Sequence, residues 1–351
     1  MDLNFPFSGL LGIPSQLTGC NNLNIENMII SIMLFSGNSY QEINKPEYVP
    51  PEFSGGTNIL VRYYQLRNDS SGHTINGSLW QPNEKKPRET TVILGMHGTL
   101  GNYFSATIGF LFQKMVARGF AFFGINMRYS NLVAKDQLVD NFYDSYSDIL
   151  TSVQFLKNLG YRNIIIMGHS MGTLHATYFC AINHDTSIVG MVISGPFADL
   201  PSKTRKVLIH DADSYRKLHR YSADFIRNNR PNDLLPLEMG FLENRKIKVT
   251  AINFYTYRDT SGSRAVSRYW IKFVSVPVLI LRDSGDQIIL PNEPLQLLRS
   301  AKSSGSLPKQ IEYYLIPNEK GPNPNGHQFL DNQDQLAARI EDWYLRVVNP
   351  N

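Results

Sequence analysis

The sequence is poor in cysteine, which limits the thiol chemistry that it can support. Among 351 residues only Cys20 and Cys180 are cysteines. Two thiols are too few for a disulfide framework or a multi-thiolate metal site. We therefore expect both side chains to pack in the core, and their scarcity fits a reducing compartment.

Long apolar runs are also missing. No stretch approaches the roughly 20 apolar residues that a membrane-spanning helix needs, and the longest run near the N-terminus, residues 28–35, is interrupted by Ser31. The first residues lack the basic segment that opens a signal peptide. These absences predict a cytoplasmic protein without a transmembrane span.

The chain has little excess of positive over negative charge, and it lacks the common cofactor-binding motifs. The net charge of +4 is too small to mark a nucleic-acid binder. The chain has neither H-E-x-x-H nor closely spaced Cys and His ligands, and no Gly-rich phosphate loop. We expect no nucleic-acid partner, no metal and no cofactor. A hydrophobic content of 42% with 18% charged residues is globular.

The chain does contain short apolar runs that alternate with helical patterns. Residues 59–66 and 74–80 alternate like a hairpin. Six further runs are typical of strands buried on both faces of a parallel sheet: 92–96, 121–126, 164–167, 189–194, 276–281 and 311–316. The helical patterns are 105–118, 145–159, 171–182, 293–300 and 331–347. The alternation predicts an α/β fold with a mostly parallel sheet and a site at the carboxyl ends of its strands.

One interval, residues 201–272, is too long for a simple connection between strands and contains its own helical pattern, residues 214–227. We interpret it as an inserted cap. It has fifteen Lys and Arg against seven Asp and Glu, a net charge of +8, whereas the rest of the chain carries −4. The predicted organisation is an N-terminal arm (1–57), a first core part (58–200), the cap (201–272) and a second core part (273–351).

The most informative motif is Gly168-His169-Ser170-Met171-Gly172, a G-x-S-x-G. It lies between a predicted strand and a predicted helix. On such a tight turn the glycines allow close passage of the backbone, and the Ser170 hydroxyl is exposed at the top of the sheet. This context predicts a catalytic nucleophile at Ser170.

On these residues the chain resembles the α/β-hydrolase superfamily, which includes serine esterases, lipases and thioesterases. The resemblance spans roughly residues 58–348, with the cap inserted between two late strands. It implies that an acid follows a late strand and that a histidine precedes the last helix. His327, in Asn-Gly-His-Gln-Phe, matches the position of the general base.

The acid of the implied triad has three candidates. Asp286 precedes two apolar residues and then Leu290-Pro291, which matches the superfamily's segment at the end of a late strand. Its role would be to hold the imidazole of the base in the right tautomer. Asp283 and Asp199 are the alternatives, and for both the simpler interpretation is a side chain that caps a turn.

The resemblance also implies two backbone donors to an oxyanion. One is the N–H of Met171, directly after the nucleophile. The other lies after the first parallel strand, and we assign it to Thr99, with Leu100 as the alternative. Arg128 stands where the superfamily often has an Asp-x-Arg pair, but the acidic position is Asn126 here, so a loop-bracing arginine is expected.

The predicted function is a serine hydrolase that cleaves a carboxylic ester of a small molecule through an acyl-Ser170 intermediate. The alternatives are an acyl thioesterase or acyltransferase on a CoA-bound or carrier-protein-bound substrate, lyase chemistry with His327 as base, and a non-catalytic binding protein. The cationic cap would attract an anionic substrate or an acyl carrier protein. Against this stands the simpler interpretation that its charges form a solvated surface.

Overall fold

The structure is a computed structural model that describes residues 40–350, apart from 54, 134–135, 210, 241–244 and 304–309. The described residues all belong to one unit, Ser39–Asn351. Cys20 and most of the predicted arm lie outside the described residues. None of the helices in the described part of the chain has the length and apolar character needed to cross a membrane.

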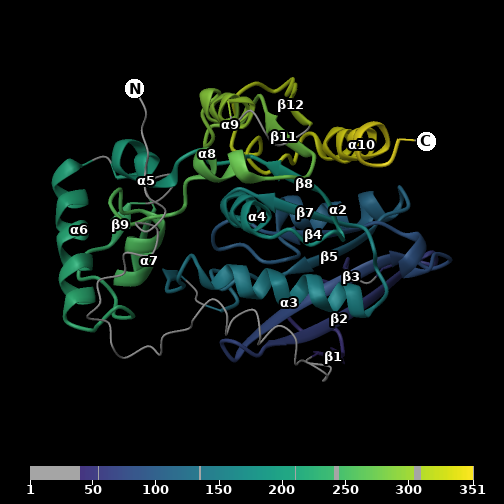
Figure 1. Ribbon diagram of the computed structural model, residues 1–351, viewed down its shortest axis with the longest axis horizontal. Helices are drawn as coiled ribbons and strands as arrows, with labels where there is room; N and C mark the ends of the chain where they lie inside the picture. The colour runs from purple at the N-terminus through teal and green to yellow at the C-terminus, as the bar shows by residue number, and fades with distance from the viewer. Residues whose placement is uncertain are drawn as a thin grey trace. The chain divides into compact units, whose positions relative to one another are not determined.

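Nine strands of the described residues form the main sheet, in the order β1-β2-β3-β5-β4-β7-β8-β11-β12 (Figure 1). Their bounds are β1 Tyr40–Ile43, β2 Ile59–Asn68, β3 His73–Pro82, β4 Val92–Met96, β5 Ala121–Ile125, β7 Ile164–His169, β8 Ile188–Ser194, β11 Val278–Asp283 and β12 Ile311–Ile316. The first three strands and β5 pair antiparallel, and all pairs from β5 to β12 are parallel. The mostly parallel sheet is confirmed, and residues 40–43 of the predicted arm form its edge strand.

The central strands are apolar on both sides because each side of the sheet faces a separate core. Along β7, Ile164 and Ile166 point into one core, whereas Ile165 and Met167 point into the other. This alternation follows from the two-residue repeat of a strand. Continuous apolar runs such as 164–167 are therefore what a sheet covered on both faces requires.

The helices divide between these two faces. Buried side chains of α3 Asp144–Asn158, α4 Met171–Ile182 and α9 Asn292–Lys302 share one core. Those of α2 Ala106–Val116 and α10 Gln333–Trp343 share the other. A π-helical segment, Tyr344–Val348, follows α10, so the regular helix ends earlier than the predicted 347. The layered arrangement brings the carboxyl ends of β4, β7, β8 and β11 together at one edge.

The interval between β8 and β11 contains the elements expected of an insertion. These are α5 Leu200–Lys203, the π-helical segment Thr204–Leu208, α6 Ala212–Arg227, β9 Met239–Gly240, β10 Lys246–Val249, α7 Ala251–Tyr257, α8 Ser267–Trp270 and the 3-10 segment Ile271–Phe273. Strand β10 also pairs with β6 Gln137–Leu138, which belongs to the loop after β5. In Figure 1 α5, α6, α7 and β9 gather at the left of the view, with the main sheet to their right.

Arg128 braces the loop after β5 against α3, as expected from its missing acidic neighbour. Its guanidinium donates two hydrogen bonds to Asp148, of 2.6 and 2.9 Å, and one of 3.1 Å to Asp144. The Asp148 side chain is 2% exposed. Asn126 stands where the superfamily often has the acidic residue of the Asp-x-Arg pair. Its side-chain oxygen accepts a hydrogen bond of 3.0 Å from the Tyr103 backbone N–H.

We expect Arg128→Ala to lower the free energy of unfolding by about 3 kcal/mol, because it leaves the buried Asp148 carboxylate without its charged partner. Urea denaturation measures this. Arg346→Ala is the matched control, since it removes an arginine whose partners Glu312 and Asp342 are exposed, and it is expected to cost less than about 1 kcal/mol. Equal losses in the two variants would contradict the bracing role.

Candidate active site

Ser170 lies on a strained turn between β7 and α4. Its backbone has φ +53° and ψ −119°, a conformation that residues other than glycine rarely adopt. Two close approaches require the flanking glycines. A Cβ on Gly168 would lie 2.3 Å from the Gly172 carbonyl oxygen, and one on Gly172 would lie 2.5 Å from that of Met96. The turn therefore has the close-packed geometry that the G-x-S-x-G spacing predicts.

The structure brings Ser170, His327 and Asp286 into one hydrogen-bonded series. His327 Nε2 lies 2.9 Å from the Ser170 hydroxyl oxygen, and its Nδ1 lies 2.9 Å from Asp286 Oδ2. Because a carboxylate accepts, His327 carries its proton on Nδ1 and accepts from the serine hydroxyl through Nε2. Asp286 comes from the loop after β11 and His327 from the loop before α10. The three side chains, far apart in the sequence, are all buried.

Asp286 is held in the charged form. Burial by itself raises the pKa of this carboxyl group, but the hydrogen bond and charge of His327 and the backbone N–H groups of Ile289 and Ile288 outweigh it and lower the pKa from 3.8. Those N–H groups donate to Oδ1 at 2.9 and 2.7 Å. The carboxylate is therefore oriented by the backbone and free to bind the imidazole through its other oxygen.

The two alternative acids are engaged elsewhere. Asp283 accepts hydrogen bonds from the Gly285 backbone and from the side-chain amides of Asn318 and Asn332. Asp199 is the N-cap of α5, accepts from Ser202 and forms an ion pair with Arg268. Each side chain thus caps a local turn, as the simpler interpretation predicted, and also binds groups distant in the sequence.

The loop after β4 lies directly against the serine. A Cβ on Gly98 would lie 2.9 Å from that of Ser170. Among the described residues no acceptor contacts the backbone N–H of Thr99 or of Met171, and both residues line the cavity beside Ser170, whereas Leu100 does not. This placement favours Thr99 over Leu100 as the second donor.

His97 supports that loop, a role that sequence reasoning missed. Its Nδ1 donates to the Gly98 carbonyl at 2.7 Å, and its Nε2 accepts from the Met127 N–H at 3.0 Å. Burial lowers the pKa of His97 to about 4, so the ring is neutral and both of its nitrogens are used. The signal available in the sequence was the position of His97 directly before the Gly98-Thr99 segment.

His169 and Gln328 form a second unpredicted contact. His169 Nε2 lies 3.1 Å from Gln328 Oε1, and its ring lies 5.0 Å from that of His327. Burial, together with the charge of His327, lowers the pKa of His169 to about 3. The neutral ring therefore packs beside the base without adding charge. Nothing in the local sequence around Gln328 indicates this contact.

Lys203 joins the insertion to the loop that carries Asp286. Its ammonium group donates to the Ile288 carbonyl and forms a buried ion pair with Glu293. Glu293 in turn accepts from the Leu290 N–H at 2.9 Å. The Ile288 carbonyl and the Ile289 N–H, which donates to Asp286, belong to the same peptide unit. The Lys203 contact therefore lies one peptide unit away from the Asp286 carboxylate.

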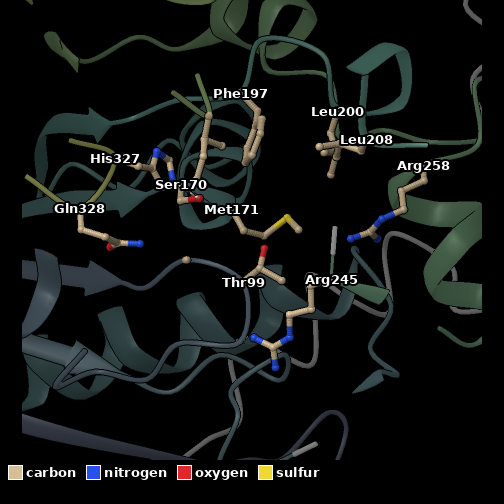
Figure 2. Close-up of a pocket in the computed structure, with 12 residues that line it drawn as sticks. Thr99, Ser170, Met171, Phe197, Leu200, Leu208, Arg245, Arg258, His327 and Gln328 are labelled. Carbon is tan, nitrogen blue, oxygen red and sulfur yellow. Dashed lines mark hydrogen bonds between the residues drawn. The ribbon is translucent and has the colours of Figure 1, made fainter. Parts of the chain in front are cut away.

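A cavity of about 240 Å³ opens beside Ser170, and Figure 2 shows the residues that line it. Ser170 and His327 lie on one side of the view and Arg258 on the other. The lining includes the apolar side chains of Phe197, Leu200, Leu208, Met171 and Ile288, and Thr99 and Arg245 lie between the two sides in the view of Figure 2. The cavity lies where the sheet edge meets the insertion, and it places both apolar and polar groups next to the serine.

Comparisons with known proteins agree with this architecture. Residues 86–250 match the family described as serine aminopeptidase, S33. The chain is similar to Est1E from Butyrivibrio proteoclasticus, with TM-score 0.57 and 16% identity over 80% of this chain and 98% of that one. It is also similar to the Pyrococcus furiosus esterase Pf2001, with TM-score 0.54 and 13% identity over 88% and 99%. A third similar structure is the Pyrococcus horikoshii acylaminoacyl peptidase, with TM-score 0.56 and 13% identity over 84% of this chain and 42% of the peptidase.

No curated protein matches the chain by sequence. The structural likeness establishes the fold, and the family match covers residues 86–250, a little under half of the chain. The chain therefore has the α/β-hydrolase fold, and both the family match and the esterase neighbours support a hydrolase. The family match includes Ser170 but ends before Asp286 and His327.

We expect Gly195→Ala to slow the reaction of Ser170 with a fluorophosphonate roughly 10- to 100-fold, because small displacements of a catalytic group are costly. Gly195 has φ +58°, and a Cβ there would lie 3.2 Å from His327 Cε1. Gly72→Ala is the matched control, since Gly72 has φ +69° with open space around it. Equal rates in the two variants would show that the contact with His327 is unimportant.

Buried His169 makes the stability of the protein depend on pH. Its folded pKa of about 3 lies below the ordinary value of 6.5, so between these values the unfolded chain binds more protons and stability falls on acidification. At pH 5 this effect is worth about 2 kcal/mol. Urea unfolding of His169→Gln should show a correspondingly smaller loss between pH 7 and pH 5. An unchanged loss would contradict the neutral ring.

Proposed function

We propose that this hydrolase cleaves a carboxylic ester through a covalent acyl-Ser170 intermediate. The observation that carries the proposal is the hydrogen-bonded series from Ser170 through His327 to Asp286 at the edge of a cavity. Beside it lie two backbone N–H groups that have no acceptor among the residues that the structure describes. A nucleophile, a base, an orienting acid and two donors are the groups that acyl transfer needs.

In the first half of the reaction His327 Nε2 accepts the Ser170 proton while the serine oxygen attacks the ester carbonyl. Asp286 stabilises the imidazolium that forms and keeps its proton on Nδ1. The negative charge that develops on the carbonyl oxygen is stabilised by the N–H groups of Met171 and Thr99. One such donor is typically worth about 10²–10³ in rate. His327 then protonates the leaving alcohol, and the acyl group stays on Ser170.

In the second half, water takes the place of the alcohol. His327 Nε2 accepts a proton from the water as its oxygen attacks the acyl carbon, and the same two N–H groups stabilise the oxyanion. Collapse of this intermediate breaks the bond to Ser170, and His327 returns the proton to the serine oxygen. The carboxylic acid leaves and the resting enzyme is restored.

The cavity supports a small-molecule acyl substrate. Its volume of about 240 Å³ is below the usual range for drug-sized ligands, roughly 300–1,000 Å³. The apolar wall formed by Phe197, Leu200 and Leu208 suits the methylene groups of an acyl chain of modest length. Transfer of the acyl group from a thioester, or to an acceptor other than water, would use the same groups and remains the alternative proposal.

Amide cleavage is a second candidate because the matching family is described as a serine aminopeptidase. The same series of groups would serve, with His327 protonating an amine in place of an alcohol. Comparison of kcat/KM for an ester and an amide of the same acyl group decides between the two leaving groups. We expect the ester to be the better substrate by more than the difference in their uncatalysed rates.

A fluorophosphonate probe and a series of 4-nitrophenyl esters test the proposal directly. We expect one covalent adduct on the wild-type protein, located at Ser170 by mass spectrometry. Ser170→Ala should lose the adduct, and kcat should fall by roughly 10⁴–10⁶. A folded wild-type protein that neither reacts with the probe nor hydrolyses any ester would overturn the function.

Asp283, the last residue of β11, and Asp286, just after it, offer a matched pair of variants for the role of the acid. Asp286→Asn should reduce kcat about 10⁴-fold, since an amide no longer holds the proton of His327 on Nδ1. Asp283→Asn alters a nearby carboxylate whose contacts are backbone and side-chain amide groups. It should lower the denaturation midpoint and leave kcat largely unchanged. The reverse pattern would assign the acid to Asp283.

A further inference from the structure

Arg258 is a buried cation in the wall of the cavity. It follows the last residue of α7, and it is 1% exposed. Figure 2 shows it on the opposite side of the view from Ser170 and His327, with its guanidinium group directed toward the cavity and with Leu208 nearby. The lining thus has Ser170 on one side of the view in Figure 2 and the Arg258 guanidinium on the other, and its apolar side chains include Phe197, Leu200 and Leu208.

The guanidinium has few partners within the protein. Its Nη1 donates to Asn253 Oδ1 at 2.9 Å, and the group lies 5.6 Å from the centre of the Tyr257 ring. Its buried Nε has no hydrogen-bond acceptor among the described residues. No carboxylate in the described part of the chain lies within ion-pair distance of it. The positive charge is therefore not neutralised by a direct contact within that part of the molecule.

The acid nearest to this network is committed to other groups. Asp140 accepts a hydrogen bond of 2.9 Å from the Asn253 side-chain amide and another from the Tyr257 hydroxyl. Asn253 thus separates Asp140 from Arg258, with its amide group bound to Asp140 and its oxygen to the guanidinium. The arrangement orients Arg258 without occupying its remaining N–H groups.

A buried charge without a partner costs several kcal/mol. Burial lowers the pKa of Arg258 only to about 10, so the group stays cationic at neutral pH. A guanidinium presents its donors in a planar fork that matches a carboxylate. A substrate carboxylate in the cavity would supply the missing partner and would take the place of water there.

The other cations of the insertion differ from Arg258. Arg245 also lines the cavity, but its side chain is 55% exposed and forms an ion pair with Asp136. Several further cations of the insertion are exposed and paired with neighbouring acids: Arg216, Lys217, Arg227, Arg230 and Arg268. Exposed pairs of this kind contribute little binding energy.

We propose that Arg258 forms an anion subsite and that the substrate is an ester that carries a carboxylate, separated from the scissile bond by a short apolar spacer. This inference rests on the proposed ester hydrolysis and adds the class of substrate. The apolar side chains of the lining receive the spacer, and the guanidinium binds the acid group. Arg258 thereby determines specificity and takes no part in the chemical steps.

The test compares charged and neutral esters that are otherwise matched. The first of the two pairs is a pair of series on the acyl side, the mono-4-nitrophenyl esters of adipic, pimelic and suberic acids and their methyl-capped analogues. Shorter diacids are avoided because their carboxylate attacks the ester intramolecularly with high effective molarity. The alcohol-side pair is 4-acetoxybenzoate and its methyl ester. The measured quantity is the ratio of kcat/KM for the charged and the neutral ester.

We expect the wild-type protein to prefer the carboxylate in one of the two pairs by roughly 10- to 100-fold, the usual range for a hydrogen-bonded charged contact. Arg258→Gln should bring this ratio to about one or below, and Arg258→Lys should give an intermediate value. Arg227→Gln removes the same charge from an exposed site of the insertion and should leave the ratio unchanged. The ratio does not depend on the fraction of folded enzyme, so partial misfolding of a variant does not affect it.

The outcomes separate this inference from the function on which it rests. A wild-type protein that hydrolyses neutral esters through Ser170 but shows no preference for a carboxylate in either pair overturns the subsite and leaves the function intact. A preference that persists in Arg258→Gln also overturns it. Failure of every ester together with absence of the fluorophosphonate adduct overturns the proposed function itself.

Discussion

Close contact between α4 and the ends of β4 and β7 is the constraint on which the site depends. The helix approaches so closely that no Cβ fits at Gly168 or Gly172. Ser170 must then turn with a positive φ, which directs its side chain away from the sheet. The same contact leaves the Met171 N–H at the start of the helix and brings the loop after β4 against the serine. One packing contact therefore arranges the proposed nucleophile and the two proposed backbone donors together, with strain in a single residue.

Two buried histidines, His169 and His97, are neutral and so do not compete with the proposed base, His327. At 5.0 Å from His327, a protonated His169 would oppose the imidazolium by about 3 kcal/mol for an effective dielectric constant near 20. Burial keeps that ring neutral, so it contributes shape and a hydrogen bond to Gln328. His97 likewise uses both nitrogens on backbone groups. The surroundings thus favour charge on His327 alone, where Asp286 compensates it.

The sequence was sufficient for the parts of the fold and site that local patterns determine. The predicted run 92–96 and the predicted helix 171–182 coincide with β4 and α4. Burial on both faces of a strand and the G-x-S-x-G turn each require a pattern of contiguous residues, which the sequence shows directly. The choice between Asp283 and Asp286 depended on the superfamily resemblance, because both lie within a few residues of the end of β11. Only the folded loop shows that Asn318 and Asn332 occupy Asp283. Contacts such as Lys203 with Glu293, or Gln328 with His169, join distant residues and have no local pattern.

The sequence also gives the net charge of a segment without showing where each charge lies in the fold. Residues 201–272 carry a net charge of +8, and several of their cations are exposed and paired with acids. Interactions between such exposed charges are screened by salt within about 10 Å. A single cation in a low-dielectric wall interacts far more strongly with a nearby anion than an exposed one does. Arg258 contributes only one of the fifteen positive charges. Yet Asn253 and Tyr257 hold Arg258 at the cavity, and its Nε–H has no acceptor in the described structure. Burial, rather than the sum of charges, therefore decides where an anionic group would bind.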